Sequence, residues 1–207
     1  GGGGAVFLAE NSVDMGNTNG WIINQPPPMD LYWVNGTGNW NDPNHWSYSS
    51  GGPGGACVPT PRDNVFFDAN SFSGGGQTVT ISVPEAYCHN MDWTGSEIYT
   101  PTFTATGWPD MFIYGSLELN TSMNMNLSAY TRFVSTDTGE TITMHGNEFP
   151  GTVYFEGIGA VWSFMDDFST SSNIRLDAGS IISNGFDMRS SGFETGSGGA
   201  KSMTLDT

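Results

Sequence analysis

Short runs of alternating apolar and polar residues recur along most of this chain. Residues 77–83, 140–144 and 173–176 are typical, since every second residue in them is apolar. This period of two places the apolar side chains on one face of a strand. Gly, Asn, Asp and Ser end each run, as turns require. No window of a dozen residues repeats apolar positions at helical spacing, so the pattern predicts an all-β protein.

From residue 110 onward the short strands recur about every eight to twelve residues, a spacing shared by sandwiches, barrels and solenoids. Each has a pair of apolar residues on one face: Leu117/Leu119, Met123/Met125, Ile142/Met144, Val153/Phe155, Trp162/Phe164, Ile174/Leu176, Phe186/Met188 and Met203/Leu205. Segments 115–120 and 179–184 look like two copies of one element. We therefore favour a β-solenoid, right-handed and β-helix-like, with about 20–25 residues per coil. A β-sandwich is the alternative.

Three regions of the chain differ in residue composition and strand pattern. Residues 1–24 are interpreted as the C-terminal end of a preceding repeat module. Residues 25–109 begin with three prolines, which form a stiff linker, and continue as a capping or junction subdomain rich in tryptophan: Trp33, Trp40, Trp46, Trp93 and Trp108. Residues 110–207 are interpreted as the first coils of the solenoid. Residues 1–8 show no secretory signal and the last residues alternate like a strand, so we expect a segment of a longer protein.

The net charge of the chain excludes some classes of binding partner. The chain has 5 Lys and Arg against 21 Asp and Glu, a formal charge of −16. Nucleic acids and anionic membrane surfaces need clustered cations, so neither is expected as a partner. No stretch approaches the roughly 18 apolar residues that span a bilayer, so no membrane insertion is expected. With 13% aromatic residues the chain is not a disordered acidic tail.

The two cysteines, Cys57 and Cys88, are candidates for a disulfide. Few lysines and many Gly, Asn, Ser and Thr residues favour an extracellular location, where disulfides form. The bond would close a loop of about 30 residues and stabilise the fold by roughly 3.5–4 kcal/mol on the chain-entropy model. Two buried free thiols are the alternative interpretation.

The sequence contains few of the residue groupings that enzymatic catalysis requires. Stabilising an enolate needs cations, but Lys201 is the single lysine and the arginines are spread among different strands. Asp166 and Asp167 are adjacent, so in a strand they point to opposite faces. The three histidines, His45, His89 and His145, lie in turns or at strand ends and no nucleophile elbow occurs. No catalytic residue is assigned, and we expect no enzyme.

Two other kinds of site remain open. Residues 39–44 and 63–70 are rich in Asn and Asp and offer the oxygen ligands that Ca²⁺ prefers, although the same side chains also build turns. No metal ligands are assigned and no other cofactor is expected. Trp40 and Trp46 are candidates for glycan stacking, with packing in a core as the alternative.

Several motifs together resemble one family. They are the Tyr-Trp-Val-Asn-Gly-Thr-Gly-Asn-Trp-Asn-Asp-Pro-Asn-His-Trp run at 32–46, with Val-Pro-Thr at 58–60, the segments 63–72 and 77–81, and Cys-His-Asn-Met-Asp-Trp-Thr-Gly at 88–95. These resemble repeat modules of giant cell-surface adhesins of Bacteroidota, of the gliding-motility SprB type, exported by type IX secretion. Segment 17–21 is similar to the end of a preceding module, and segments 141–143, 149–157 and 162–164 resemble the first coils of the next.

The resemblance implies a non-enzymatic structural and adhesive segment of a long extracellular surface filament. Its partners would be a surface polysaccharide or another adhesion substrate, and the secretion and motility machinery would act through other parts of the protein. The resemblance implies no catalytic residue. The alternatives are a carbohydrate-binding β module and a fragment of a β-helical polysaccharide-degrading enzyme.

Overall fold

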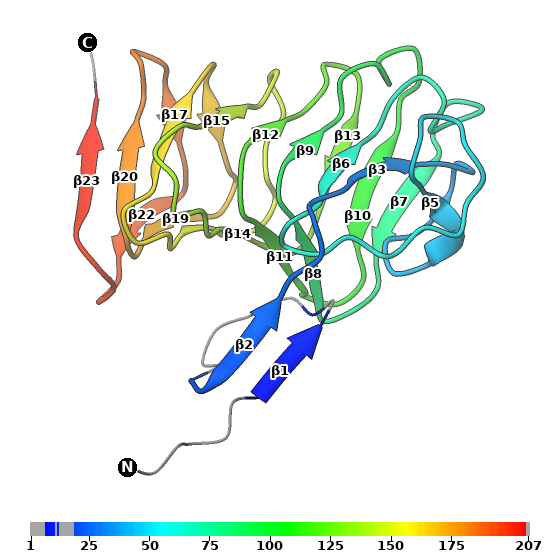
Figure 1. Cartoon of the computed structure of the whole chain (residues 1–207). Coiled ribbons are helices and arrows are strands. Elements are labelled where there is room, and N and C mark those ends of the chain that lie inside the picture. Colours follow the sequence, from blue (N-terminus) through cyan, green and yellow to red (C-terminus); the bar gives the residue numbers. More distant parts are fainter. Residues whose placement is uncertain (1–6, 11, 13–18, 206–207) are drawn as a thin grey trace, which may run out of the picture.

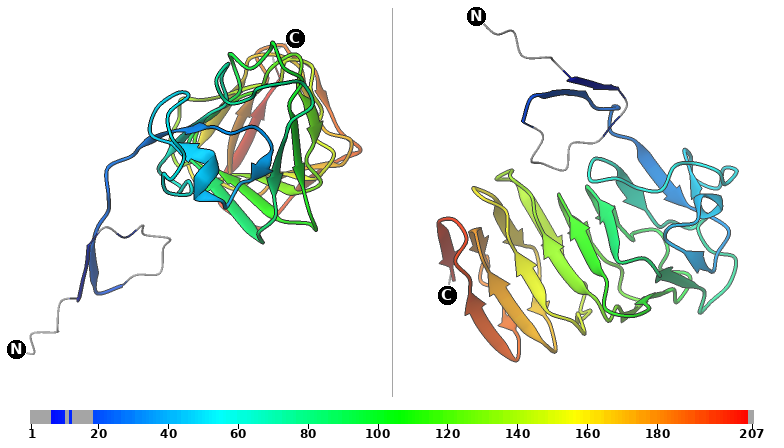
Figure 2. Two further views of the ribbon diagram at one scale, coloured as in Figure 1. Left: turned by 90° about the vertical axis from the view of Figure 1, so that its right-hand side faces the viewer. Right: turned by 90° about the horizontal axis from the view of Figure 1, so that it is seen from below.

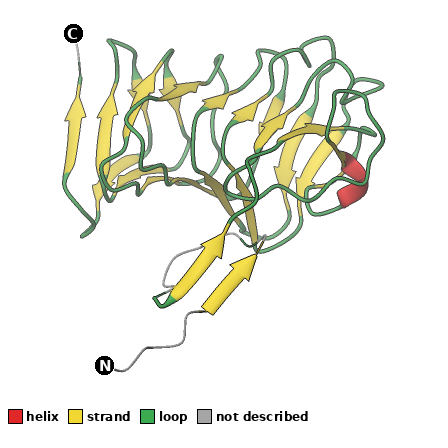
Figure 3. Ribbon diagram, viewed as in Figure 1, coloured by secondary structure: helices red, strands yellow, loops and turns green. Residues whose placement is uncertain are grey.

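The structure, a computed structural model, describes residues 7–10, 12 and 19–205 and is almost entirely β (Figures 1 and 3). Its single helical element in these residues is a 3₁₀ turn, η1 (Pro43–His45), which begins at the N-cap Asp42. The prediction of an all-β protein is confirmed.

One sheet of nine strands runs the length of the molecule. Its strands, in spatial order, are β23 (Lys201–Thr204), β20 (Gly179–Ile182), β17 (Val161–Phe164), β15 (Glu140–Thr143), β12 (Leu117–Glu118), β9 (Met91–Asp92), β6 (Asn64–Phe66), β3 (Asp30–Trp33) and β5 (Trp46–Ser47). All neighbours pair in parallel except β5, which is antiparallel to β3 at one end.

Further sheets form the other sides of the same coils. A six-stranded sheet contains β22 (Gly192–Thr195), β19 (Asn173–Leu176), β16 (Val153–Phe155), β14 (Tyr130–Phe133), β11 (Asp110–Ile113) and β8 (Glu85–Cys88). A four-stranded sheet contains β13 (Asn124–Asn126), β10 (Thr102–Ala105), β7 (Thr78–Ile81) and β4 (Gly38–Asn39), and a two-stranded sheet contains β18 (Phe168–Ser169) and β21 (Met188–Arg189).

Because the chain passes from one sheet to the next and then returns one strand further along, the coils stack into a β-solenoid, as predicted. Viewed roughly along the solenoid axis, in the left panel of Figure 2, successive coils of the chain overlap one another.

The strand register gives the length of each coil. Met91 pairs with Val65 and Leu117 with Met91, 26 residues apart in both cases. Ile142 follows Leu117 by 25 residues, and Ile181 follows Trp162 by only 19. The later coils agree with the predicted length of about 20–25 residues, whereas the earlier ones are longer.

The sheets run without interruption across residues 109 and 110, where we expected a separate junction subdomain to give way to the solenoid. β6 and β9 lie before this point and pair in parallel with each other, and β12 beyond it pairs with β9. The tryptophan-rich segment thus forms the first coils of the same stack. Only its beginning, with η1 and the antiparallel β5, departs from the coil pattern.

The first strands form a sheet of their own. β1 (Phe7–Glu10) pairs in parallel with β2 (Trp21–Asn24), outside the stacked coils (Figure 1). Residues 1–6, 11 and 13–18 of the module end expected at 1–24 lie outside the described residues. Residues 25–29, which contain the expected proline linker, have no regular structure and lead directly into β3.

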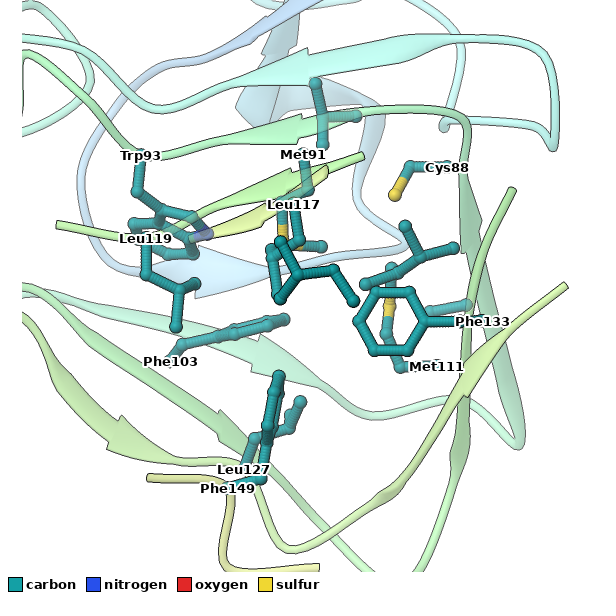
Figure 4. Packing of buried hydrophobic residues seen from close by; sticks show 14 of the residues in the cluster. Cys88, Met91, Trp93, Phe103, Met111, Leu117, Leu119, Leu127, Phe133 and Phe149 are labelled. Atoms are coloured by element: carbon teal, nitrogen blue, oxygen red, sulfur yellow. The ribbon is translucent and has the colours of Figure 1, made fainter. Parts of the chain in front are cut away.

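The apolar core runs along the inside of the coils as columns of side chains in register. In the six-stranded sheet one column consists of Cys88, Ile113, Phe133, Phe155 and Leu176. Figure 4 shows part of this core, with Phe133 and Leu117 pointing toward each other from facing sheets.

Of the apolar pairs expected on one face, the first six point inward and all but Met125 are buried. Phe186 and Leu205 are exposed because no further coil covers this end within the described residues.

Aromatic rings fill the wide parts of the interior. Phe67 stacks on Trp93 with ring centroids 3.7 Å apart and planes 6° from parallel. Phe133 stacks on Phe155 from the neighbouring coil at 5.1 Å, and Phe155 also contacts Trp162 edge to face. Such contacts add about 0.5–1.5 kcal/mol per pair beyond the buried area.

We therefore expect Phe155→Ala to lower the free energy of unfolding by about 3–5 kcal/mol, because it removes a buried ring and leaves a cavity. Equilibrium urea unfolding measures the change. Phe193→Ala is the matched control, since Phe193 is 43% exposed on the terminal strand β22. Equal losses for the two variants would contradict the arrangement of the core.

Candidate functional site

Trp40 and Trp46, the residues suggested for glycan stacking, are core residues. Both are at most 1% exposed, and their rings meet edge to face with centroids 5.0 Å apart. Trp46 also donates a hydrogen bond from Nε1 to the carbonyl oxygen of Trp40 at 2.7 Å. The suggested glycan platform is wrong, because packing against Phe67 and Phe103 encloses both indoles.

Cys57 and Cys88 are free, so the expected disulfide is not formed. Cys88 is fully buried because β8 alternates, with Ala86 and Cys88 inward and Tyr87 outward. Its sulfur lies among the core side chains in Figure 4. Cys57 lies in the exposed loop between β5 and β6, where its Sγ accepts a hydrogen bond from the Tyr48 hydroxyl at 3.6 Å. Burial raises the pKa of the Cys88 thiol well above its ordinary value.

The two segments suggested for calcium use their carboxylates to build turns. Asp42 Oδ1 accepts hydrogen bonds from the backbone and side-chain nitrogens of Asn44. Asp63 accepts from the backbone nitrogens of Met29 and Thr60, and Asp68 accepts from that of Asn70. In the part of the chain that the structure describes, no three His, Cys, Asp or Glu side chains gather at one point. These contacts explain the Asn and Asp content through turn formation.

The histidines and the paired aspartates have separate surroundings. His45 stacks on Trp33 with ring centroids 4.8 Å apart, and its Nδ1 lies 2.9 Å from the Val34 carbonyl oxygen. Asp166 accepts hydrogen bonds from the backbone nitrogens of Met144 and His145, so it fixes the turn after β15. Asp167 accepts from the backbone nitrogen of Asp187 in the next coil.

The outer faces of the coils differ in chemistry. The four-stranded sheet presents rows of small polar side chains, with Thr78 beside Thr102 and Thr80 beside Thr104. The nine-stranded sheet carries a ladder in which Asn90 donates to Asn64 Oδ1 and Asn64 donates to Asp30 Oδ1. The same sheet also carries the stacked rings of Tyr32 and Phe66, in register with Asp92. The six-stranded sheet combines aromatic rings with arginines.

On that sheet one row of outward residues runs across all the strands in register. It consists of Tyr87, Phe112, Arg132, Tyr154, Arg175 and Glu194. Tyr87 stacks on Phe112 with centroids 5.2 Å apart, and the Arg132 guanidinium lies 4.2 Å from the centroid of the Tyr154 ring. This face therefore combines flat aromatic rings with fixed cations.

Arg132 connects three coils. Its Nε donates to Asp110 Oδ1 at 2.5 Å in the preceding coil, and its Nη1 donates to Glu156 Oε1 at 2.8 Å in the following one. Burial works against the charged form, but the two carboxylates more than offset this and raise the pKa of Arg132. The ion pairs therefore fix the spacing of β11, β14 and β16 on their outer face.

Three rings form what we call the aromatic track: Trp108, Tyr130 and Tyr154, of which Tyr154 also belongs to this row. The Trp108 and Tyr130 centroids are 6.2 Å apart, and those of Tyr130 and Tyr154 are 5.8 Å apart. Each ring comes from a different coil. Tyr130 pairs with Asp110, two residues after Trp108, and Tyr154 pairs with Arg132, two residues after Tyr130, so the track runs obliquely across the six-stranded sheet. Trp108 lies in the turn between β10 and β11, where Gly107 has a φ of +79°, a conformation that glycine adopts without strain.

A hollow of about 450 Å³ begins at Trp108 and is lined by residues 82–85 and 106–110. Two carboxylates, Glu85 and Asp110, belong to its wall. Glu85 Oε2 accepts a hydrogen bond from the Tyr87 hydroxyl, and Asp110 Oδ1 accepts from Arg132. Burial first, and then the hydrogen bond to Glu85, raise the pKa of Tyr87, which keeps its phenol protonated.

Sequence reasoning missed the aromatic track, although part of its signal was present. The inward pair Val153/Phe155 places Tyr154 outward by alternation, and Trp108 lies between Gly107 and Pro109 in a turn. The register between coils could not be predicted, because the coils differ in length. Without the register, the sequence does not show which outward residues become neighbours.

No protein-family model, curated protein or solved structure matches this chain. Among residues 7–10, 12 and 19–205, no helix has the length or apolar composition to cross a membrane.

Thiol accessibility tests the state of the cysteines. In the native protein we expect one thiol, Cys57, to react with a thiol reagent, because the core excludes the reagent from Cys88. After unfolding without reductant, both thiols react. Protein with no reactive thiol in the unfolded state would instead contain the disulfide.

Substitution of Arg132 tests the charged contacts between coils. Arg132→Gln is expected to lower the free energy of unfolding by about 1–3 kcal/mol, because Asp110 and Glu156 lose charge-assisted hydrogen bonds. Arg189→Gln is the control: its side chain is 66% exposed, and its loss should change the stability by no more than about 0.5 kcal/mol. Equal effects in chemical denaturation would show that the Arg132 contacts stabilise nothing.

Proposed function

We propose that this chain is a non-enzymatic structural and adhesive segment of a long extracellular surface filament that contacts a surface polysaccharide. The observation that carries the proposal is the nine-stranded sheet, which continues through every coil from β3 to β23. In such a stack each coil contacts only its neighbours, so length can be added without changing the fold. This architecture suits a protein that must extend from a cell.

The resemblance of segments 32–46, 58–60, 63–72, 77–81 and 88–95 to gliding-motility adhesins supports the same role. In that family the segment would be exported by type IX secretion, and parts of the protein outside it would engage the secretion and motility machinery. The charge of −16 supports an extended extracellular rod, because like charges keep neighbouring filaments apart.

A carbohydrate-binding module is the second candidate function. The exposed ring of Trp108 beside a hollow with two carboxylates favours it. The two functions are compatible, since a filament adheres through such surfaces.

An attachment assay under flow tests the adhesive role. Beads coated with the 207-residue chain should be retained on polysaccharide-coated surfaces, whereas beads coated with the heat-unfolded chain should not. The same surfaces should release no reducing ends or unsaturated sugars during the assay. Sugar release would replace the proposal with a degrading enzyme, and a lack of retention on every polysaccharide would reject the adhesive role.

A further inference from the structure

Trp108 differs from every other tryptophan of the coils. It is 67% exposed, whereas the remaining ones are buried: Trp33, Trp40, Trp46, Trp93 and Trp162. The fold therefore has room for large indoles inside the stack, and Trp108 lies outside it. Exposing so large an apolar ring costs free energy in water unless a partner covers it.

The surroundings of Trp108 are those of a site for hydroxyl-bearing rings. The hollow beside it contains carboxylates and backbone groups as well as the apolar surfaces of Val83, Pro84 and Pro109. Glu85 Oε1 and Asp110 Oδ2 accept no hydrogen bond from any described residue. A ligand with hydroxyl donors at the edge of an apolar ring face would satisfy both oxygens and cover the indole.

The aromatic track extends this contact obliquely across the outer face of the six-stranded sheet. Trp108, Tyr130 and Tyr154 come from successive coils, and parallel strands lie about 4.8 Å apart. A linear polymer placed along this oblique line would meet one aromatic ring at each coil. A single small ligand would use only the first of the three.

The charged residues around the hollow favour binding of a neutral polymer over an acidic one. Glu85 and Asp110 are the charged residues of the hollow, and no Lys or Arg belongs to its wall. Arg132, whose guanidinium lies 5.9 Å from the centroid of the Tyr130 ring, is already paired with Asp110 and Glu156. Together with the charge of −16 on the chain, these carboxylates repel an acidic polysaccharide.

We infer that the hollow at Trp108 and the aromatic track bind a neutral polysaccharide that crosses the six-stranded sheet obliquely, along the line of the track. This inference rests on the proposed adhesive function and assigns its contact surface and its class of substrate. Sugar rings stack on Trp108 and Tyr130, and their hydroxyl groups donate hydrogen bonds to Glu85 and Asp110.

Binding of defined polysaccharides to single variants tests the inference. Soluble neutral β-glucan, soluble neutral α-glucan and polygalacturonate are titrated into the full 207-residue chain by calorimetry. At least one neutral glucan should bind and polygalacturonate should not. Trp108→Ala should weaken binding about tenfold or more, the equivalent of one lost stacking contact of about 1.4 kcal/mol. Tyr130→Ala should also weaken it, and Tyr130→Phe should retain it because the ring remains.

Trp21→Ala is the matched control, since Trp21 is 51% exposed on β2, outside the coils. It should bind like the unsubstituted chain, and all variants should unfold at the same urea concentration. Unchanged binding by Trp108→Ala, an equal loss in Trp21→Ala, binding of polygalacturonate alone, or no neutral glucan binding would each overturn the inference. If beads coated with Trp108→Ala are still retained under flow, the adhesive function stands and only this surface is rejected.

Discussion

The stacking of each coil on the next is the interaction on which the whole molecule depends. A single coil has short strands and an apolar inner face that it cannot bury alone. Parallel pairing in register solves both problems. Each strand gains hydrogen-bond partners, and each inward apolar side chain packs on an apolar side chain of the next coil. The column of Ile113, Phe133 and Phe155 shows the result. Where the stack ends among the described residues, at β22 and β23, apolar side chains such as Phe193 are exposed.

The same register that builds the core also builds the outer surface. Tyr154 is outward because Val153 and Phe155 are inward, and it meets Arg132 because β14 and β16 pair without a shift. The aromatic track and the row of Tyr87, Phe112 and Arg132 are thus consequences of coil stacking. A change in the length of one coil that shifted the register by one residue would exchange the inner and outer faces of a strand.

Alternation in the sequence predicted the strands and the inward pairs, and the recurrence of these pairs together with two similar segments favoured the solenoid over a sandwich. The alternation also contained the burial of Cys88, since Ala86 and Cys88 alternate with Glu85 and Tyr87. The disulfide was predicted instead from a composition that favours an extracellular location. Burial of Trp40 and Trp46 could not be predicted locally, because Phe67 and Phe103, which cover them, come from later parts of the chain. The continuity of the sheets across residue 109 was missed for the same reason. The composition of the sequence changes near residue 109, but the parallel pairing of strands continues there, because β12 pairs with β9.

A double-mutant cycle on Phe133 and Phe155 tests most directly whether neighbouring coils stabilise each other through their stacked side chains. The two rings lie 5.1 Å apart on paired strands, and Phe→Leu at each position shortens the side chain without emptying the site. The account predicts a coupling free energy of about 0.5–1.5 kcal/mol for this pair. Phe67→Leu with Phe155→Leu, three strand spacings or about 14 Å apart along the axis, should be additive within about 0.5 kcal/mol. Additive effects of Phe133→Leu and Phe155→Leu would contradict the account.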